Sequence, residues 1–115
     1  MKGESIIQAG IVEALSYIAV RHNFFFFSIP NERRGVSFAE LMSLKKMGMV
    51  PGIPDLCVIK NKKVYFMEVK TETGKLSLSQ SLVQDEIIKH AAGYSVVRSI
   101  EDAMMFLRAC GVISA

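Results

Sequence analysis

The sequence predicts a single α/β domain, residues 1–115, in which a mixed β-sheet is flanked by helices. Segments with apolar residues at helical spacing alternate with short apolar runs that are typical of strands. Their order is helix, strand, helix, strand, strand, helix, strand, helix, which favours a sheet covered on both faces. With 115 residues, 50% of them hydrophobic, the chain can build one real core and has no room for a second domain.

The first two elements are a long helix and a phenylalanine-rich strand. Apolar residues such as Ile11 and Leu15 recur at helical spacing, so residues 4–21 should form an amphipathic helix. The four phenylalanines Phe24 to Phe27 cannot all lie on one face of a strand. We therefore expect this strand to be covered on both sides, either inside the sheet or at a dimer contact.

A short inserted helix and a hairpin follow. Ser37 and Glu40 have the spacing of a capping box, and Gly48 can provide the left-handed stop of the helix. The apolar runs 55–59 and 64–70, joined by a polar link, then predict a two-stranded hairpin.

The last third of the chain should add a helix, a strand and a second helix. Ser77 or Ser79 can cap the first of these helices, which should stop near Gly93. Residues 94–97 form an apolar run suited to a core strand. Ser99 can begin the C-terminal helix, which completes the predicted order of elements.

Three charged residues of the hairpin predict a reactive site. Glu68 and Lys70 lie two apart on one strand and so share a face, and Asp55 opens the neighbouring strand. Two carboxylates on adjacent strands form a hard oxygen site suited to Mg²⁺ or Mn²⁺, and a lysine beside them can touch a water or a phosphate oxygen. Taken alone, such a pair is more often a solvated surface pair. Charges that end a strand as apolar as 64–67, however, need a partner such as a metal.

The same residues belong to a longer ordered set, in which Glu68 follows Asp55 by thirteen positions. In order, the set comprises Glu4 with Gln8, Ile29 to Arg34, Gly48 to Asp55, Glu68 to Lys70, and Gly74 to Ser77 with Gln80. With these motifs the chain resembles the PD-(D/E)XK nuclease superfamily and, within it, the virus-type replication-repair nuclease family, VRR-NUC. The resemblance covers nearly the whole chain. It implies a restriction-endonuclease-like αβββαβ core with one extra helix after the first strand and one at the C-terminus.

The resemblance also implies roles for single residues. Asp55 and Glu68 would bind Mg²⁺ or Mn²⁺, the backbone carbonyl of Val69 would complete the protein ligands, and Glu4 would approach from the first helix. Glu4 is about equally well explained as an acid that complements the helix dipole. Lys70 would act as a base or neutralise the phosphate, and Gln80 would hydrogen-bond the attacking water or the phosphate. The residues expected to contact DNA are Gln8, Asn31, Arg33, Arg34 and Lys75.

Composition limits the partners. A net charge of +3 and a pI near 9.0 suit a partner made of phosphates, and no apolar run reaches the ~18 residues of a membrane span. Cys57 and Cys110 lack metal-binding spacing and are interpreted as reduced core residues of a cytoplasmic protein, whose family resemblance also suggests a viral or prophage origin.

The sequence therefore predicts a homodimeric, Mg²⁺-dependent DNA endonuclease that cuts branched DNA such as a four-way (Holliday) junction. The dimer is expected because the chain is short and very apolar. Two alternatives remain: a monomer that cuts flaps or single strands, and a DNA-binding subunit that has lost activity.

Overall fold

The computed structural model describes residues 2–30 and 36–114, in which helices and strands alternate in the predicted order. The elements are α1 (Lys2–His22), β1 (Phe25–Ser28), α2 (Phe38–Lys46), β2 (Leu56–Lys60), β3 (Lys63–Val69), α3 (Leu78–His90), β4 (Gly93–Val97) and α4 (Ile100–Ala109). Within these described ranges, no helix has the length and apolar composition that a membrane crossing requires.

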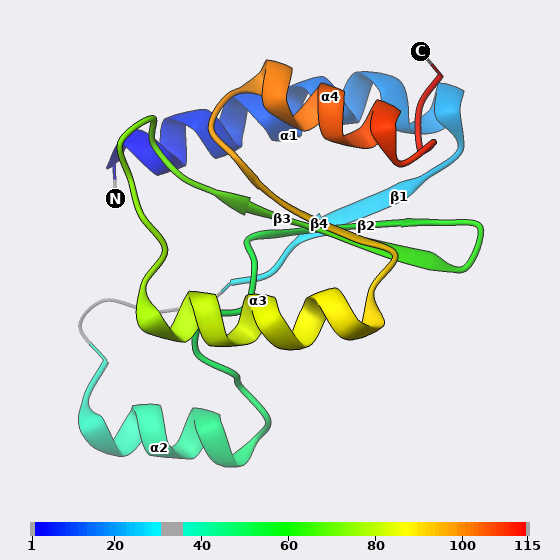
Figure 1. Ribbon diagram of the computed structural model, residues 1–115. Coiled ribbons are helices and arrows are strands. Elements are labelled where there is room, and N and C mark those ends of the chain that lie inside the picture. Colours follow the sequence, from blue (N-terminus) through cyan, green and yellow to red (C-terminus); the bar gives the residue numbers. More distant parts are fainter. Residues whose placement is uncertain (1, 31–35, 115) are drawn as a thin grey trace.

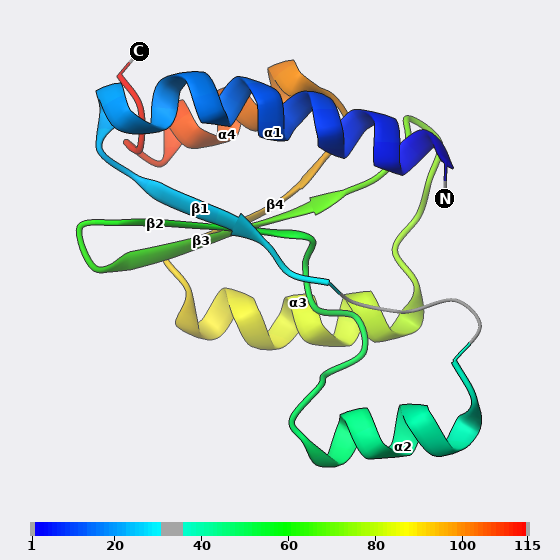
Figure 2. The same cartoon turned by 180° about the vertical axis from the view of Figure 1, so that it is seen from behind.

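The four strands form one mixed sheet in the order β1-β2-β3-β4. β1 and β2 are antiparallel, as are β2 and β3, whereas β3 and β4 are parallel. Helices α1 and α4 cover one face of the sheet and α3 covers the other, as Figure 1 and its reverse view in Figure 2 show. The α/β class and the mixed sheet flanked by helices on both faces are thus confirmed.

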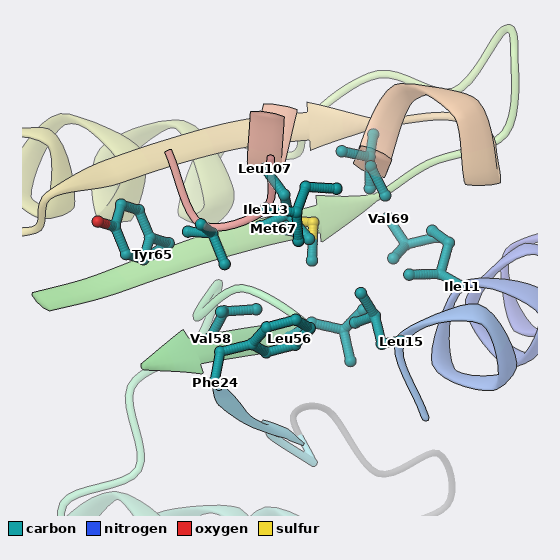
Figure 3. Close-up of a cluster of buried hydrophobic side chains, with 13 residues drawn as sticks. Ile11, Leu15, Phe24, Leu56, Val58, Tyr65, Met67, Val69, Leu107 and Ile113 are labelled. Atoms are coloured by element: carbon teal, nitrogen blue, oxygen red, sulfur yellow. The ribbon is translucent and has the colours of Figure 1, made fainter. Parts of the chain in front are cut away.

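The main core lies between the sheet and the α1–α4 layer (Figure 3). Alternate residues of β3, namely Tyr65, Met67 and Val69, point into it and meet Ile11 and Leu15 of α1. Because side chains alternate along a strand, the residues between them, including Glu68, face α3 instead. The acidic residue is therefore directed away from the main core and toward the helix that follows β3.

A tight turn sets the register of the central hairpin. Asn61 and Lys62 both have positive φ, 52° and 67°, as a two-residue turn matched to the strand twist requires. Leu56 then pairs with Met67. This register brings Asp55, the residue before β2, next to Glu68, as the sequence predicted.

Of the two places expected for the phenylalanine strand, inside the sheet or at a dimer contact, the structure excludes the first. β1 is an edge strand, not an interior one, because it pairs with β2 alone in the described sheet. Phe24 and Phe26 pack with the core, whereas Phe25 is 65% exposed. The strand is thus covered on one face within the chain, and its other face is open.

Helix α2 begins with the predicted capping box, in which Ser37 and Glu40 satisfy each other's backbone N–H groups. Gly48 follows it with φ of 100°. None of the residues of α2 is buried, and Phe38 at its start is 77% exposed. Figures 1 and 2 show α2 set apart from the sheet, on the far side of α3.

Candidate functional site

Asp55 is held in place by the backbone on both sides of it. Its carbonyl accepts a hydrogen bond from the N–H of Ile29 at 2.8 Å, which ties it to the end of β1. Its carboxylate oxygen Oδ2 accepts one from the N–H of Val69, also at 2.8 Å. The carboxylate is therefore fixed against β3, beside the carboxyl group of Glu68.

Glu68 is the most unusual residue of the fold, because it is a carboxyl group with only 1% of its surface exposed. Its Oε2 atom accepts a hydrogen bond from Nε2 of Gln80 at 3.1 Å. Its Oε1 atom is buried and has no hydrogen-bond partner among the described residues. A buried acceptor that receives no hydrogen bond costs free energy, so this atom calls for either a proton shared with the carboxyl group of Asp55 or a cation.

The surroundings of Glu68 strongly favour its neutral form. Burial raises its pKa most, a hydrogen bond with Asp55 and the charge of Asp55 raise it further, and Glu4 adds to this, so that the pKa reaches about 9 despite the opposing charge of Lys70. Two carboxyl groups this close cannot both ionise readily without a cation between them. The pair is therefore arranged to hold either a proton or a positively charged ligand.

Lys70 supplies a positive charge on the same side of β3. It is only 7% exposed, and its backbone N–H donates to the carbonyl of Val97 on β4. Its ammonium group forms no ion pair or hydrogen bond within residues 2–30 and 36–114, although its charge acts on Glu68. The ammonium group is thus available to a ligand that approaches the two carboxyl groups.

Gln80 serves both its helix and the site. Its Oε1 accepts from the N–H of Ser77 at 2.9 Å, while its own N–H donates to Oγ of Ser77 at 3.2 Å, so the two residues form a capping box. The amide nitrogen of the same side chain, Nε2, donates the hydrogen bond to Oε2 of Glu68. Because the cap fixes the side chain, the amide points at the carboxyl group as a consequence of how α3 begins.

Gly52 allows the segment before Asp55 to pack closely against the start of α3. It has φ of 88° and is buried. A methyl group built on it would lie 2.5 Å from the carbonyl carbon and oxygen of Ser79 and 2.8 Å from the nitrogen of Gln80. These are backbone atoms, so the contact leaves no space for a side chain. Gly52 therefore sets how closely Asp55 and Gln80 approach each other.

We expect Gly52→Ala to lower the free energy of unfolding by about 2 kcal/mol or more. The added methyl group strains the backbone at a positive φ, and it also forces the first turn of α3 to move. Gly48→Ala is the matched control, since Gly48 also has positive φ, 100°, but no atom lies within 4 Å of the added methyl. Urea unfolding of both variants separates the clash from the strain. Equal losses in the two variants would contradict the close packing of Gly52.

The other predicted residues lie at different distances from this centre. Glu4 is half-buried on α1 and close enough to raise the pKa of Glu68, whereas Lys75 is exposed before α3. Gln8 lines an open pocket of about 330 Å³ together with Ser28 of β1. Three further residues expected to contact DNA, Asn31, Arg33 and Arg34, lie outside the described residues.

The acidic residues do not form a complete metal cage. Among the described residues, no three or more His, Cys, Asp or Glu side chains gather in a way that could hold a metal ion. Glu4 thus does not join Asp55 and Glu68 as a third ligand in this arrangement. The pair Asp55–Glu68 remains, with the free oxygen of Glu68 as the observation that favours a cation.

Sequence reasoning missed Tyr94 on β4. Burial raises its pKa to about 12, with contributions from the charges of Glu68 and Asp55, so the phenol lies within electrostatic reach of the carboxyl pair. Tyr94 pairs with Phe66 in the parallel β3–β4 ladder. The sequence contains no signal that Tyr94 lies near the carboxyl pair, because the register of two parallel strands joined by a helix depends on the packing of that helix.

Comparison with known proteins adds no assignment. No protein-family model matches the chain, and neither the curated proteins nor the solved structures contain a match to it. The candidate site is therefore interpreted from its own geometry.

Proposed function

We propose that the protein is a metal-dependent nuclease that hydrolyses phosphodiester bonds in DNA. The observation that carries this proposal is the fully buried Glu68, whose Oε1 accepts no hydrogen bond from a donor group while Asp55 and Lys70 lie beside it. A structural ion pair would have paired Lys70 with one of the carboxylates, and a surface pair would be solvated. Neither description fits a buried acid with one unused oxygen and an unpaired lysine next to it.

The residues present fit a divalent cation with oxygen ligands. Asp55 and Glu68 would hold it, the resemblance to PD-(D/E)XK nucleases adds the backbone carbonyl of Val69, and Glu4 lies near enough to contribute its charge. Mg²⁺ commonly binds through one or two carboxylates and keeps several waters, so a cage of three acids is not required. When bound, such an ion supplies the positive charge that offsets the extra negative charge of the transition state.

The side chains around the carboxyl pair have separate tasks. Gln80 donates to Oε2 of Glu68 and so fixes the direction of its other oxygen. Lys70 is buried beside the carboxyl pair, where it would either accept a proton from the attacking water or neutralise the phosphate. Asp55 is already held by Val69, so its carboxylate needs little reorganisation to bind a cation.

DNA is the substrate that charge and family resemblance favour. The chain carries a net charge of +3, and Lys75 is exposed on the connection between Lys70 and Gln80. Phosphate backbones attract such a surface regardless of sequence. The αβββαβ order of the core elements is the one expected of a restriction-endonuclease-like fold, and membership of the VRR-NUC family is proposed on the motifs alone.

A single assay tests this function. Labelled four-way junction, flap, single-stranded and linear duplex DNA are incubated with Mg²⁺, Mn²⁺ or EDTA, with Asp55→Asn as the inactive control. We expect cleavage only with a divalent ion and preferentially of the junction. Preference for flaps or single strands would support a monomeric nuclease, and tight DNA binding without cleavage under any condition would identify a binding subunit and overturn the proposal.

We further propose that two copies associate through the open face of β1. Phe25 is 65% exposed there and its ring lies 5.8 Å from that of Phe27, so the edge strand presents an aromatic pair to solvent. Exposed apolar patches of this kind usually mark an interface, and an unprotected edge strand invites pairing. A two-fold dimer would offer two equivalent sites to a branched DNA.

Replacing both Phe25 and Phe27 by Ser should therefore convert a dimer to a monomer. Tyr17→Ser serves as the control, because Tyr17 is also exposed but lies on α1, and this variant should stay dimeric. Light scattering across a concentration series gives the mass of each form. A monomeric wild-type protein, or a double variant that remains dimeric, would contradict the interface.

A further inference from the structure

Arg98, which follows β4 directly, ties down the connection between β3 and α3. Its Nη1 atom donates to the carbonyl of Thr71 at 2.6 Å and to that of Gly74 at 2.7 Å, with a longer contact of 3.3 Å to the carbonyl of Glu72. Thr71 and Gly74 are the two ends of a turn, closed by the N–H of Gly74 donating to the carbonyl of Thr71 at 3.1 Å. One guanidinium group thus holds both ends of the turn 71–74.

The turn 71–74 packs against Lys70 at the end of β3 and against the first turn of α1. It starts immediately after Lys70, and a methyl group built on Gly74 would lie 3.5 Å from Cδ of Lys70. One built on Gly3 would lie 3.0 Å from Cγ2 of Thr71, so the turn also abuts the first turn of α1, next to Glu4. In Figure 1 the start of α1 and the loop after β3 lie side by side, and Figure 2 shows the same from behind.

The third neighbour of the turn is the start of α3. Three residues after Gly74, Ser77 begins the capping box whose Gln80 reaches Glu68. The segment that connects Lys70 to Gln80 is therefore held in place by hydrogen bonds from the guanidinium group of Arg98.

Arg98 is itself held firmly. Its backbone N–H donates to Oδ2 of Asp102 at 3.0 Å, and the N–H of Asp102 donates to Oγ of Ser99, the N-cap of α4. No acidic side chain forms an ion pair with its guanidinium group among the described residues. All three contacts come from the single atom Nη1, and a lysine ammonium group, which carries three N–H donors on a differently shaped side chain, could make part of them.

We infer that Arg98 is a positioning residue: by holding the turn 71–74 it sets Lys70 and Gln80 around Glu68. The effect of Arg98 on catalysis rests on the proposed nuclease function, whereas its effect on the position of Gln80 does not. Arg98 acts through the turn and does not touch the carboxyl groups.

Three readouts compare Arg98→Met and Arg98→Lys with Arg108→Met, which removes the same charge from an exposed position on α4. The first is tryptic cleavage after Lys75, followed by mass spectrometry; we expect it to be about tenfold faster or more in Arg98→Met, because the connection opens locally. The second is the side-chain amide resonance of Gln80, which should shift. The third is junction cleavage with Mg²⁺, in which kcat should fall about tenfold or more while KM changes little.

Arg98→Lys should recover part of each readout, and it replaces Arg98→Met if that variant does not fold. Unchanged proteolysis and an unchanged Gln80 resonance in both Arg98 variants would overturn the inference. So would an unchanged kcat in a variant whose turn has opened. If wild-type protein cuts no DNA, the proposed function fails, and the inference is then decided by proteolysis and by the Gln80 resonance.

Discussion

Asp55→Asn and Glu68→Gln should each reduce DNA cleavage by about three orders of magnitude or more, because each removes a carboxylate that would hold the cation. Lys70→Ala should be impaired to a similar degree, since Lys70 carries the unpaired ammonium group beside the pair. Single-turnover cleavage of a labelled junction under Mg²⁺ measures these losses. DNA binding, measured separately by fluorescence anisotropy in EDTA, should stay within a few-fold of wild type.

Glu13→Gln is the control for these substitutions, because it makes the same chemical change at an exposed position of α1. It should cleave at the wild-type rate. Wild-type activity in both Asp55→Asn and Glu68→Gln would refute the assignment of the site. Loss of binding along with cleavage would show instead that the carboxylates matter for folding or for docking of DNA.

The second large effect concerns pH and stability without a divalent ion. Glu68 has a pKa of about 9 in the folded protein against a usual value of 4.5, so between these values the folded state keeps a proton that the unfolded state has lost. The free energy of unfolding should therefore decrease as pH rises through this window, by about 1.4 kcal/mol per pH unit where a full proton separates the states. Below the lower value both states are protonated and the effect vanishes.

Glu68→Gln keeps the shape of the side chain and removes the titration. In EDTA, its melting temperature relative to wild type should rise steadily from pH 5 to pH 8.5, and other titrating groups largely cancel in this difference. Mg²⁺ should reduce the difference in melting temperature between Glu68→Gln and wild type at high pH, because a cation stabilises the ionised carboxylate of the wild type only. A pH-independent difference would mean that Glu68 ionises normally and is not desolvated as the fold indicates.

Much of the fold was predictable because its signals are local. The capping boxes at Ser37 and Ser77, the stop at Gly48 and the alternation that separates Glu68 from Met67 are all readable over a few residues. The closeness of Asp55 to Glu68 was also predictable, because it follows from a short hairpin with a two-residue turn.

What escaped prediction depends on long-range packing. Four phenylalanines in a row specify an apolar strand but not its place in the sheet, so the sequence left open whether it lies inside the sheet or at a dimer contact, and the structure places it at the edge with Phe25 exposed. Tyr94 and Arg98 reach the site region only because β4 runs parallel beside β3, and that pairing is fixed by α3 and α4 rather than by any neighbouring residue. The failure of Glu4 to join a three-acid cluster has a similar origin, because the position of α1 over the sheet is a tertiary property.

The strand order also has a consequence for how the chain folds. Every pair of neighbouring strands is consecutive in sequence, but only β2 and β3 are joined by a short turn, so this hairpin can form first through short-range contacts. Closing β1 onto β2 across residues 29–55, or β4 onto β3 across residues 70–92, costs about 2 kcal/mol more in loop entropy than the two-residue turn of the hairpin. Glu68 lies on the hairpin, and Asp55 and Lys70 directly adjoin its two ends. The carboxyl pair and Lys70 are thus expected to come together early in folding, whereas Gln80 and the aromatic edge join later.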